Sequence, residues 1–202
     1  MESVNIQSIV DAVAGRLFIE LEASGRHVHV TKDQAIRLFG HPLTPERPLS
    51  QPGQFLAKER VSVVGPKGRF QKVAVLGPER KEAQVEMSFT DGRSLGIDLP
   101  VRLSGDVAGT PGAILEGPAG RVTLEQGALA AQRHIHMTPA DAAHFGVKDK
   151  QVVKLQTFTS RPVIFEDVPV RVREDFATYA HLDYDEANAC GFAPGSLGRI
   201  LP

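Results

Sequence analysis

The chain has 202 residues, of which 42% are hydrophobic and 23% charged, so it can bury an ordinary core in one compact domain or two small ones. Its formal net charge of -1 excludes general electrostatic capture of nucleic acid or of an anionic membrane, which needs a strong basic excess. The single cysteine, Cys190, excludes an internal disulfide, and no apolar run is long enough to span a bilayer, so we expect a cytoplasmic protein.

The first predicted element is a short amphipathic helix. Residues 6–18 place apolar side chains at helical spacing ahead of Gly25. This apolar stripe could pack on the body of the protein or dock to a partner surface.

Beyond this helix the chain is predicted to be mainly β. Short segments rich in β-branched residues alternate with Gly, Pro or Asp turns, and two short helices are expected at Lys32 to Phe39 and at Pro139 to Phe145. Nineteen glycines and fourteen prolines suit many tight turns, so small β-barrels are favoured over a helical bundle. The predicted strands are Val28 to Val30, Val61 to Val64, Val73 to Leu76, Val85 to Phe89, Val152 to Leu155, Val163 to Phe165 and Val168 to Val172.

An internal repeat organises the chain. The segment Arg26-His27-Val28-His29-Val30-Thr31 recurs 107 residues later as Arg133-His134-Ile135-His136-Met137-Thr138, and the segment around Glu86 aligns with that around His181, 95 residues later. The first copy is thus 12 residues longer, and the excess fits a surface loop over His41 to Gly53. We expect two pseudo-repeated β-barrel domains. The expected boundaries are 1–24 for the helix and lead-in, 25–104 and 121–202 for the two halves, and 105–120 for the connector.

The repeated histidine pairs predict metal sites. Side chains at i and i+2 of a strand point to one face about 6.6 Å apart, so two imidazoles so placed can converge on one ion. Glu86 and His181 occupy equivalent positions in the repeat and supply a third ligand to each half. We therefore expect one site of His27, His29 and Glu86 and a second of His134, His136 and His181, each with the three protein ligands typical of catalytic zinc. His144 is expected to face solvent, and His41, which lies in a loop before Pro42, is given no functional role.

A basic run between Lys58 and Lys81 carries seven Lys or Arg residues against Glu59 and Glu79. Such a run usually forms a solvated face. Because this one precedes Glu86, part of it is expected to line the metal cleft and attract an anion. Arg80 is the candidate for direct contact, since a guanidinium can bind phosphate with two hydrogen bonds.

These residues resemble the phosphate propanoyltransferases of the propanediol-utilisation type over nearly the whole chain. The resemblance is carried by both histidine motifs and by the segments Gln51 to Gln54, Val64 to Pro66, Leu76 to Pro78 with Arg80, Gln84 to Glu86, and Ile97 through Ser104-Gly105. It implies two small β-barrel domains with two zinc ions at their interface. It also implies reversible exchange of an acyl group between coenzyme A and phosphate.

The resemblance assigns the two histidine motifs, Glu86 and His181 to the metals and Arg80 to phosphate. Asn188, Leu76 and His181 match its coenzyme A contacts. Members often work inside bacterial microcompartments, which they enter through a short amphipathic peptide, so the stretch over residues 6–18 could bind shell or lumen proteins. A homo-oligomer is also compatible with the resemblance.

Two other interpretations remain open from the residues alone. A single-metal, cupin-like barrel enzyme would use one histidine pair, a Glu and a distant His, and would bind one metal per chain. A non-enzymatic, zinc-stabilised interaction module would unfold on metal removal and carry no acyl-phosphate chemistry.

Overall fold

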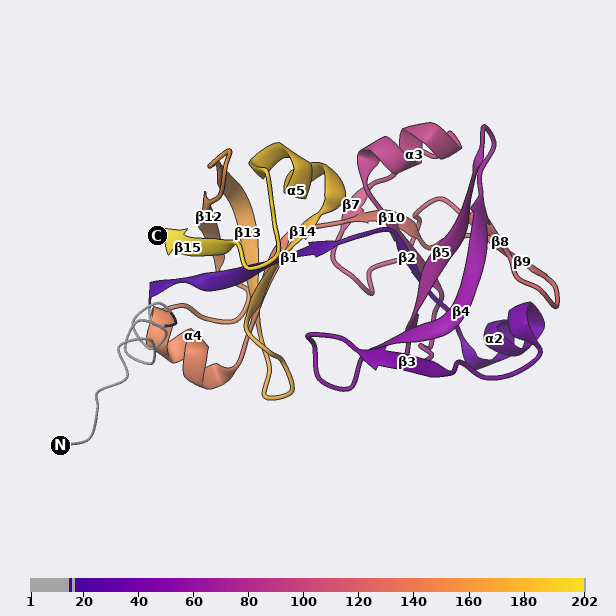
Figure 1. The fold of residues 1–202 in the computed structure, drawn as a ribbon, viewed down its shortest axis with the longest axis horizontal. Helices are drawn as coiled ribbons and strands as arrows, with labels where there is room; N and C mark the ends of the chain where they lie inside the picture. Colours follow the sequence, from indigo (N-terminus) through magenta and orange to yellow (C-terminus); the bar gives the residue numbers. More distant parts are fainter. Residues whose placement is uncertain (1–14, 16, 202) are drawn as a thin grey trace. The chain divides into compact units, whose positions relative to one another are not determined.

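The computed structural model describes residue 15 and residues 17–201. The predicted amphipathic helix over residues 6–18 falls almost wholly outside them. The chain divides into two compact units (Figure 1). One, the barrel unit, contains the described residues up to Ala23, Arg133–Leu182 and the chain from Glu186 onward; the other, the sheet unit, contains Ser24–Gln132 with Asp183–Asp185.

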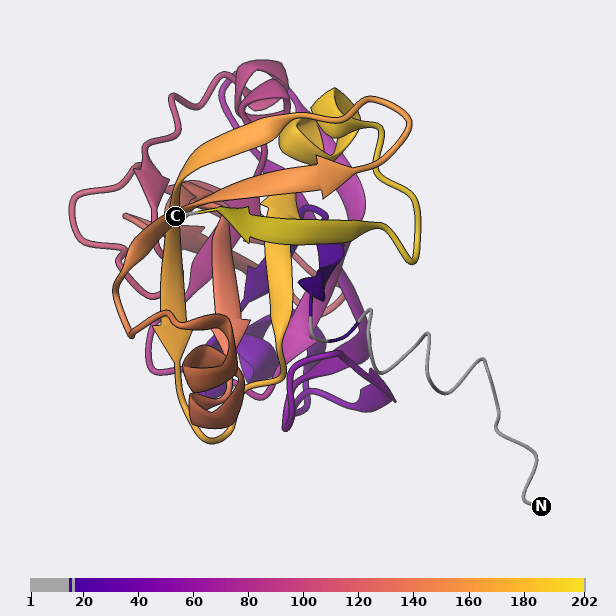
Figure 2. The same ribbon diagram turned by 90° about the vertical axis from the view of Figure 1, so that its left-hand side faces the viewer.

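The barrel unit is built on a closed six-stranded barrel with the strand order β1-β14-β11-β13-β12-β15. Strands β12, β13 and β15 lie side by side in Figure 2. The barrel encloses its own apolar core, in which Ile135, Leu155 and Val170 are fully buried. Its elements are β1 (Ile19–Ser24), β11 (His134–Met137), α4 (Pro139–Phe145), β12 (Val152–Phe158), β13 (Ile164–Val172), β14 (Tyr179–Asp183), α5 (Tyr184–Cys190) and β15 (Leu197–Leu201), of which the residues Ser24 and Asp183–Asp185 are grouped with the sheet unit.

The sheet unit is a nine-stranded sheet with the order β7-β10-β6-β2-β5-β4-β8-β9, and β3 pairs with β4. The long β4–β5 hairpin is prominent in Figure 1. A second apolar core lies here, with Val28, Val75 and Leu115 fully buried. Its elements are β2 (His27–His29), α2 (Lys32–Phe39), β3 (Pro45–Pro48), β4 (Phe55–Val64), β5 (Arg69–Gly77), β6 (Gln84–Met87), α3 (Phe89–Leu95), β7 (Val101–Arg102), β8 (Ala113–Glu116), β9 (Arg121–Leu124) and β10 (Ala128–Ala131).

The mainly β architecture predicted from the sequence is confirmed, and so are both predicted helices, α2 and α4. The two units use the same strand arrangement around each histidine motif. β2 pairs in parallel with β5 and antiparallel with β6, while β11 pairs in parallel with β13 and antiparallel with β14. The repeat seen in the sequence is therefore a repeat of strand pairing.

Several local expectations differ from the structure. The strand predicted over Val85 to Phe89 ends at Met87, because Ser88 caps helix α3 by accepting a hydrogen bond from the Asp91 backbone N–H. The strands predicted at Val163 to Phe165 and Val168 to Val172 merge into β13. Within residues 105–120, expected to be a connector, β8 pairs with both β4 and β9.

Candidate metal centre

The first metal-competent group, here called the HHE cluster, consists of His27, His29 and Glu86. His27 and His29 lie on one face of β2, with the fully buried Val28 on the other. Glu86 comes from the neighbouring strand β6, where it is the direct cross-strand partner of His27. Its Oε1 atom lies 3.5 Å from Nε2 of His27 and 3.8 Å from Nε2 of His29. All three side chains are buried.

Backbone carbonyls orient both imidazoles of the HHE cluster. Nδ1 of His27 lies 2.8 Å from the carbonyl oxygen of Gly25, and Nδ1 of His29 lies 3.1 Å from that of Leu76. A carbonyl accepts a hydrogen bond only from a protonated nitrogen, so Nδ1 of each ring carries a proton, and Nε2 is the ring nitrogen that faces Glu86. Metal-ligating histidines are held in this way in proteins.

The side chains of the HHE cluster shift one another's pKa values. Burial by itself raises the pKa of Glu86, but the imidazoles of His27 and His29 and the Ser104 hydrogen bond hold it below its usual value. Burial opposes protonation of His27, yet the Glu86 carboxylate raises its pKa above the ordinary value. Burial and the positive charges of His27 and Arg80 hold the pKa of His29 well below the ordinary value. The cluster thus pairs an ionised carboxylate with a neutral His29.

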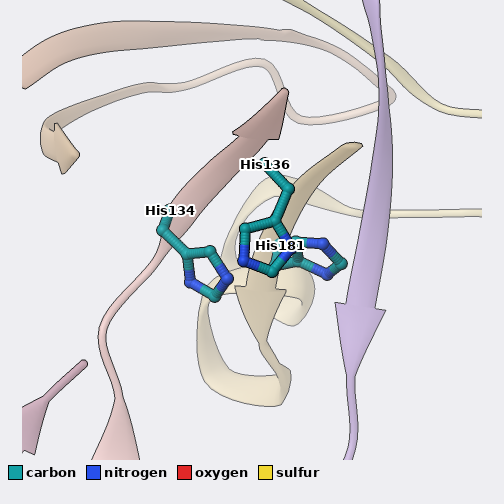
Figure 3. Close-up of side chains that lie close together, drawn as sticks. All are labelled: His134, His136 and His181. Carbon is teal, nitrogen blue, oxygen red and sulfur yellow. The ribbon is translucent and has the colours of Figure 1, made fainter. Parts of the chain in front are cut away.

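The second group, the HHH cluster, consists of His134, His136 and His181. His134 and His136 extend from β11, and His181 extends from the adjacent strand β14, where it is the cross-strand partner of His134. The three rings point toward one another (Figure 3). The ring centroids of His134 and His136 are 4.5 Å apart. The centroid of the His181 ring lies 4.9 Å from that of His134 and 4.8 Å from that of His136.

Neighbouring side chains orient and shield the HHH cluster. Nδ1 of His181 lies 3.1 Å from a carboxylate oxygen of Glu22 on β1, and the ring of Phe176 stacks on His136 at 4.0 Å. Burial, together with the charges of His134, His181 and Arg171, lowers the pKa of His136 to about 2. His136 is therefore neutral at physiological pH.

Both clusters fit a transition metal. Ligand atoms bound about 2.0–2.1 Å from one tetrahedral ion lie roughly 3.4 Å apart, close to the separations within the HHE cluster, and in each group the ligand atoms all lie within 4.8 Å of one another. Both ring nitrogens of His136 are buried without a hydrogen-bond partner among the described residues, an arrangement that is costly unless a ligand completes it. Imidazole and carboxylate donors, three per cluster, suit zinc with an open coordination position.

Arg80 lies beside the HHE cluster. Its backbone N–H donates to the carbonyl of Val30 at 2.9 Å, its Nη1 donates to the Ser104 hydroxyl at 3.1 Å, and its charge acts on both histidines of the cluster. Two other arginines of the basic run form ion pairs, Arg60 with Glu46 and Arg69 with Glu116. Arg80 thus lies beside the HHE cluster, and its contact with an anion stays a prediction.

The remaining candidate residues have varied surroundings. Leu76 is half-buried on β5 and provides the carbonyl that orients His29. Asn188 is exposed on α5. Cys190 is buried, and its thiol donates to the carbonyl of Ala187 at 3.4 Å. His41 and His144 are exposed, as was expected for His144.

Sequence reasoning missed several residues around the clusters. Glu22 and Phe176 contact the HHH cluster from segments that carry no motif. Gln84 and Ser104 contact Glu86, and both lie within segments that carry the family resemblance, which was the available signal. These contacts join residues far apart in the chain or on separate strands, so spacing alone does not reveal them.

Comparisons with known proteins agree with one another. A family model described as phosphate propanoyltransferase matches residues 20–193. The chain is 51% identical to the phosphate propanoyltransferase of Listeria monocytogenes, over 100% of this chain and 97% of that protein. It is 51% identical to the protein of that name from Enterococcus faecalis, over 100% and 98% of the two chains, and 52% identical to that from Thermotoga maritima, over 88% and 86%. Among the described residues, no helix is long and apolar enough to cross a membrane.

Proposed function

Because this chain belongs to the phosphate propanoyltransferase family, we propose that it exchanges a short acyl group, propanoyl above all, between coenzyme A and inorganic phosphate, with one zinc ion in each cluster. The reaction class rests on the family assignment over residues 20–193. The observation that supports the metal requirement is the pair of three-ligand clusters at equivalent positions of the two units.

In the proposed reaction, a phosphate oxygen attacks the thioester carbonyl carbon. A carbon–oxygen bond forms and the carbon–sulfur bond breaks, and the electron pair leaves with sulfur as the coenzyme A thiolate. Zinc, when bound, supplies Lewis acidity that polarises oxygen atoms and stabilises negative charge. Arg80 binds the phosphate through its guanidinium, which orients the nucleophile and offsets its charge as it approaches.

Transfer is direct, without an acyl-enzyme. A covalent route would need an activated nucleophile, and thiolate character is what makes cysteine reactive. Burial raises the pKa of the Cys190 thiol above its ordinary value. Cys190 is therefore a packed residue of the barrel core.

Coenzyme A contacts are proposed for Leu76, Asn188 and His181, with His181 serving also as a ligand of the HHH cluster. Because Asn188 is exposed, its side-chain amide is accessible to a polar part of coenzyme A. Residues 6–18 are proposed to direct the protein to the lumen of a bacterial microcompartment, which can be tested by fusing this segment to a fluorescent protein.

A coenzyme A release assay tests the proposed function. Acetyl-CoA, propanoyl-CoA and butanoyl-CoA are each supplied with and without phosphate, before and after treatment with a chelator. We expect phosphate-dependent release, fastest with propanoyl-CoA, that is lost after chelation and restored by zinc. Equal release without phosphate would identify a thioesterase instead, and undiminished release after complete metal removal would contradict the metal requirement.

A further inference from the structure

Gln84 occupies a buried position next to the HHE cluster. It precedes Glu86 by two residues on β6, so both side chains lie on one face of the strand, and only 1% of its surface is exposed. Its amide nitrogen donates to Oε1 of Glu86 and, at 3.0 Å, to the hydroxyl of Ser104. Its amide oxygen accepts from the backbone N–H of Gly105 at 2.7 Å. Gln84 therefore joins the metal-binding strand to the segment at residues 104–105.

The Ser104 hydroxyl connects Gln84, Glu86 and Arg80. It donates to Oε1 of Glu86 at 2.8 Å and accepts from Nη1 of Arg80 at 3.1 Å as well as from Gln84. A hydroxyl has one donor and two acceptor positions, so these three bonds use its whole capacity. Since Arg80 and Gln84 are donors, the hydroxyl proton must point at Glu86.

We propose that Gln84 is a positioning residue for acyl transfer. Through Ser104 it holds the guanidinium of Arg80 at a set distance and angle from the Glu86 carboxylate, so that a phosphate bound by Arg80 meets a metal in the HHE cluster in one orientation. This inference rests on the proposed function, because it assigns Arg80 to phosphate. Oriented outer partners of metal ligands commonly matter about 10- to 100-fold in metal affinity or activity.

Comparison of the two repeated units argues that the role of Gln84 is not confined to folding. Gln84 is the cross-strand partner of His29, and the equivalent partner of His136 in the barrel unit is Tyr179. The same strand pairing thus forms with a different residue at this position. The amide is therefore not a requirement of the strand arrangement, and it occurs in the unit whose cluster contains a carboxylate and lies beside Arg80.

The test uses Gln84→Met, which keeps the side-chain length but removes all three amide hydrogen bonds, together with Ser104→Ala and the double variant. Gln126→Met is the matched control, because Gln126 also accepts a backbone N–H, from Gly109 at 3.2 Å, but on an exposed loop. Zinc affinity is measured by competition with a chromophoric chelator, and kcat and KM are measured for each substrate.

We expect Gln84→Met to lower the affinity for one of the two zinc ions at least about tenfold and to leave the affinity for the other unchanged. The variant should also lower kcat about tenfold or more, while the KM for acyl-CoA stays within about threefold of wild type. The double variant should be little worse than the poorer single one, because both changes break one network. Zinc affinities and kcat within about threefold of wild type would overturn the proposal.

Other outcomes remain decisive. If Gln84→Met fails to fold, as judged by circular dichroism, Ser104→Ala alone must show the lowered kcat and the single weakened zinc, and normal values in it would overturn the proposal. If the wild-type protein transfers no acyl group, the proposed function fails, but the zinc titration still decides whether Gln84 orients the HHE cluster.

Discussion

The candidate histidine ligands show how much individual side chains depend on their surroundings. The identity and spacing of His27 and His29 are visible in the sequence, but the choice of coordinating nitrogen depends on the carbonyls of Gly25 and Leu76. Gly25 is two residues away, whereas Leu76 lies on another strand. A metal site thus combines local spacing with long-range hydrogen bonds that orient its ligands.

Arg80 is expected to act mainly on the transition state. A guanidinium held beside the HHE cluster should bind the phosphate more strongly as charge redistributes, so Arg80→Ala should lower kcat roughly 100-fold or more. Arg80→Lys should recover little of this loss, because a point charge cannot make the two-pronged contact.

Zinc content should stay at the wild-type level in both Arg80 variants, as measured by elemental analysis. Arg69→Ala is the control, since Arg69 is exposed and paired with Glu116, and its turnover should be near normal. Near-normal turnover in Arg80→Ala, or an effect confined to coenzyme A binding, would show that Arg80 does not bind the transferred phosphate.

Cys190→Ala should leave turnover within a few-fold of wild type. The thiol is buried, its pKa is raised by burial, and direct transfer requires no covalent acyl-enzyme. Steady-state turnover and the unfolding temperature are measured together. Loss of activity in a normally folded variant would instead identify a thioester-forming nucleophile.

At the scale of elements, the threonine after each histidine motif begins a helix. Thr31 accepts from the backbone N–H of Gln34 at the start of α2, and Thr138 accepts from that of Asp141 at the start of α4. Each motif therefore places two candidate ligands on a strand and is followed directly by a capped helix. This local pattern, a strand motif followed by an N-cap threonine, explains why both helices are predictable from the sequence.

Thr31→Ala and Thr138→Ala should each lower the free energy of unfolding by about 1 kcal/mol. For a protein of this size, that loss corresponds to a fall of about 2–4 °C in the unfolding temperature, measurable by scanning calorimetry. Zinc content should not change. Thr123→Ala, at an exposed position of β9, should have little effect, and an equal effect there would argue against capping as the cause.

At the scale of the whole molecule, the two repeated units predict how many metal ions the protein binds. The purified protein should contain about two zinc ions per chain, because each unit has its own three-ligand cluster. Elemental analysis after gentle purification provides the measurement.

His27→Ala and His134→Ala should each reduce the count to about one, since each removes a ligand from a different cluster. A wild-type count of one would support the single-metal barrel enzyme and contradict the assignment of ligands from the repeat. A count of two that falls to zero in either variant would show that the clusters do not bind metal independently.

The sequence by itself determined the mainly β class, the internal repeat, helices α2 and α4 and the six metal-ligand candidates. Each of these depends on local spacing, or on comparing one half of the chain with the other. The alignment of Glu86 with His181 was enough to place a third candidate ligand beside each histidine pair, because equivalent strands pair in the same register in both units.

Only the tertiary structure decided the rest. Helix α3 replaces the end of a predicted strand because Ser88 and Asp91 cap it, and β1 joins the barrel through pairing with β15 near the other end of the chain. The link from Gln84 through Ser104 to Arg80 joins three segments that meet only after the sheet has formed. Such contacts depend on strand order and register, which arise from burying apolar faces across the whole unit rather than from any local pattern.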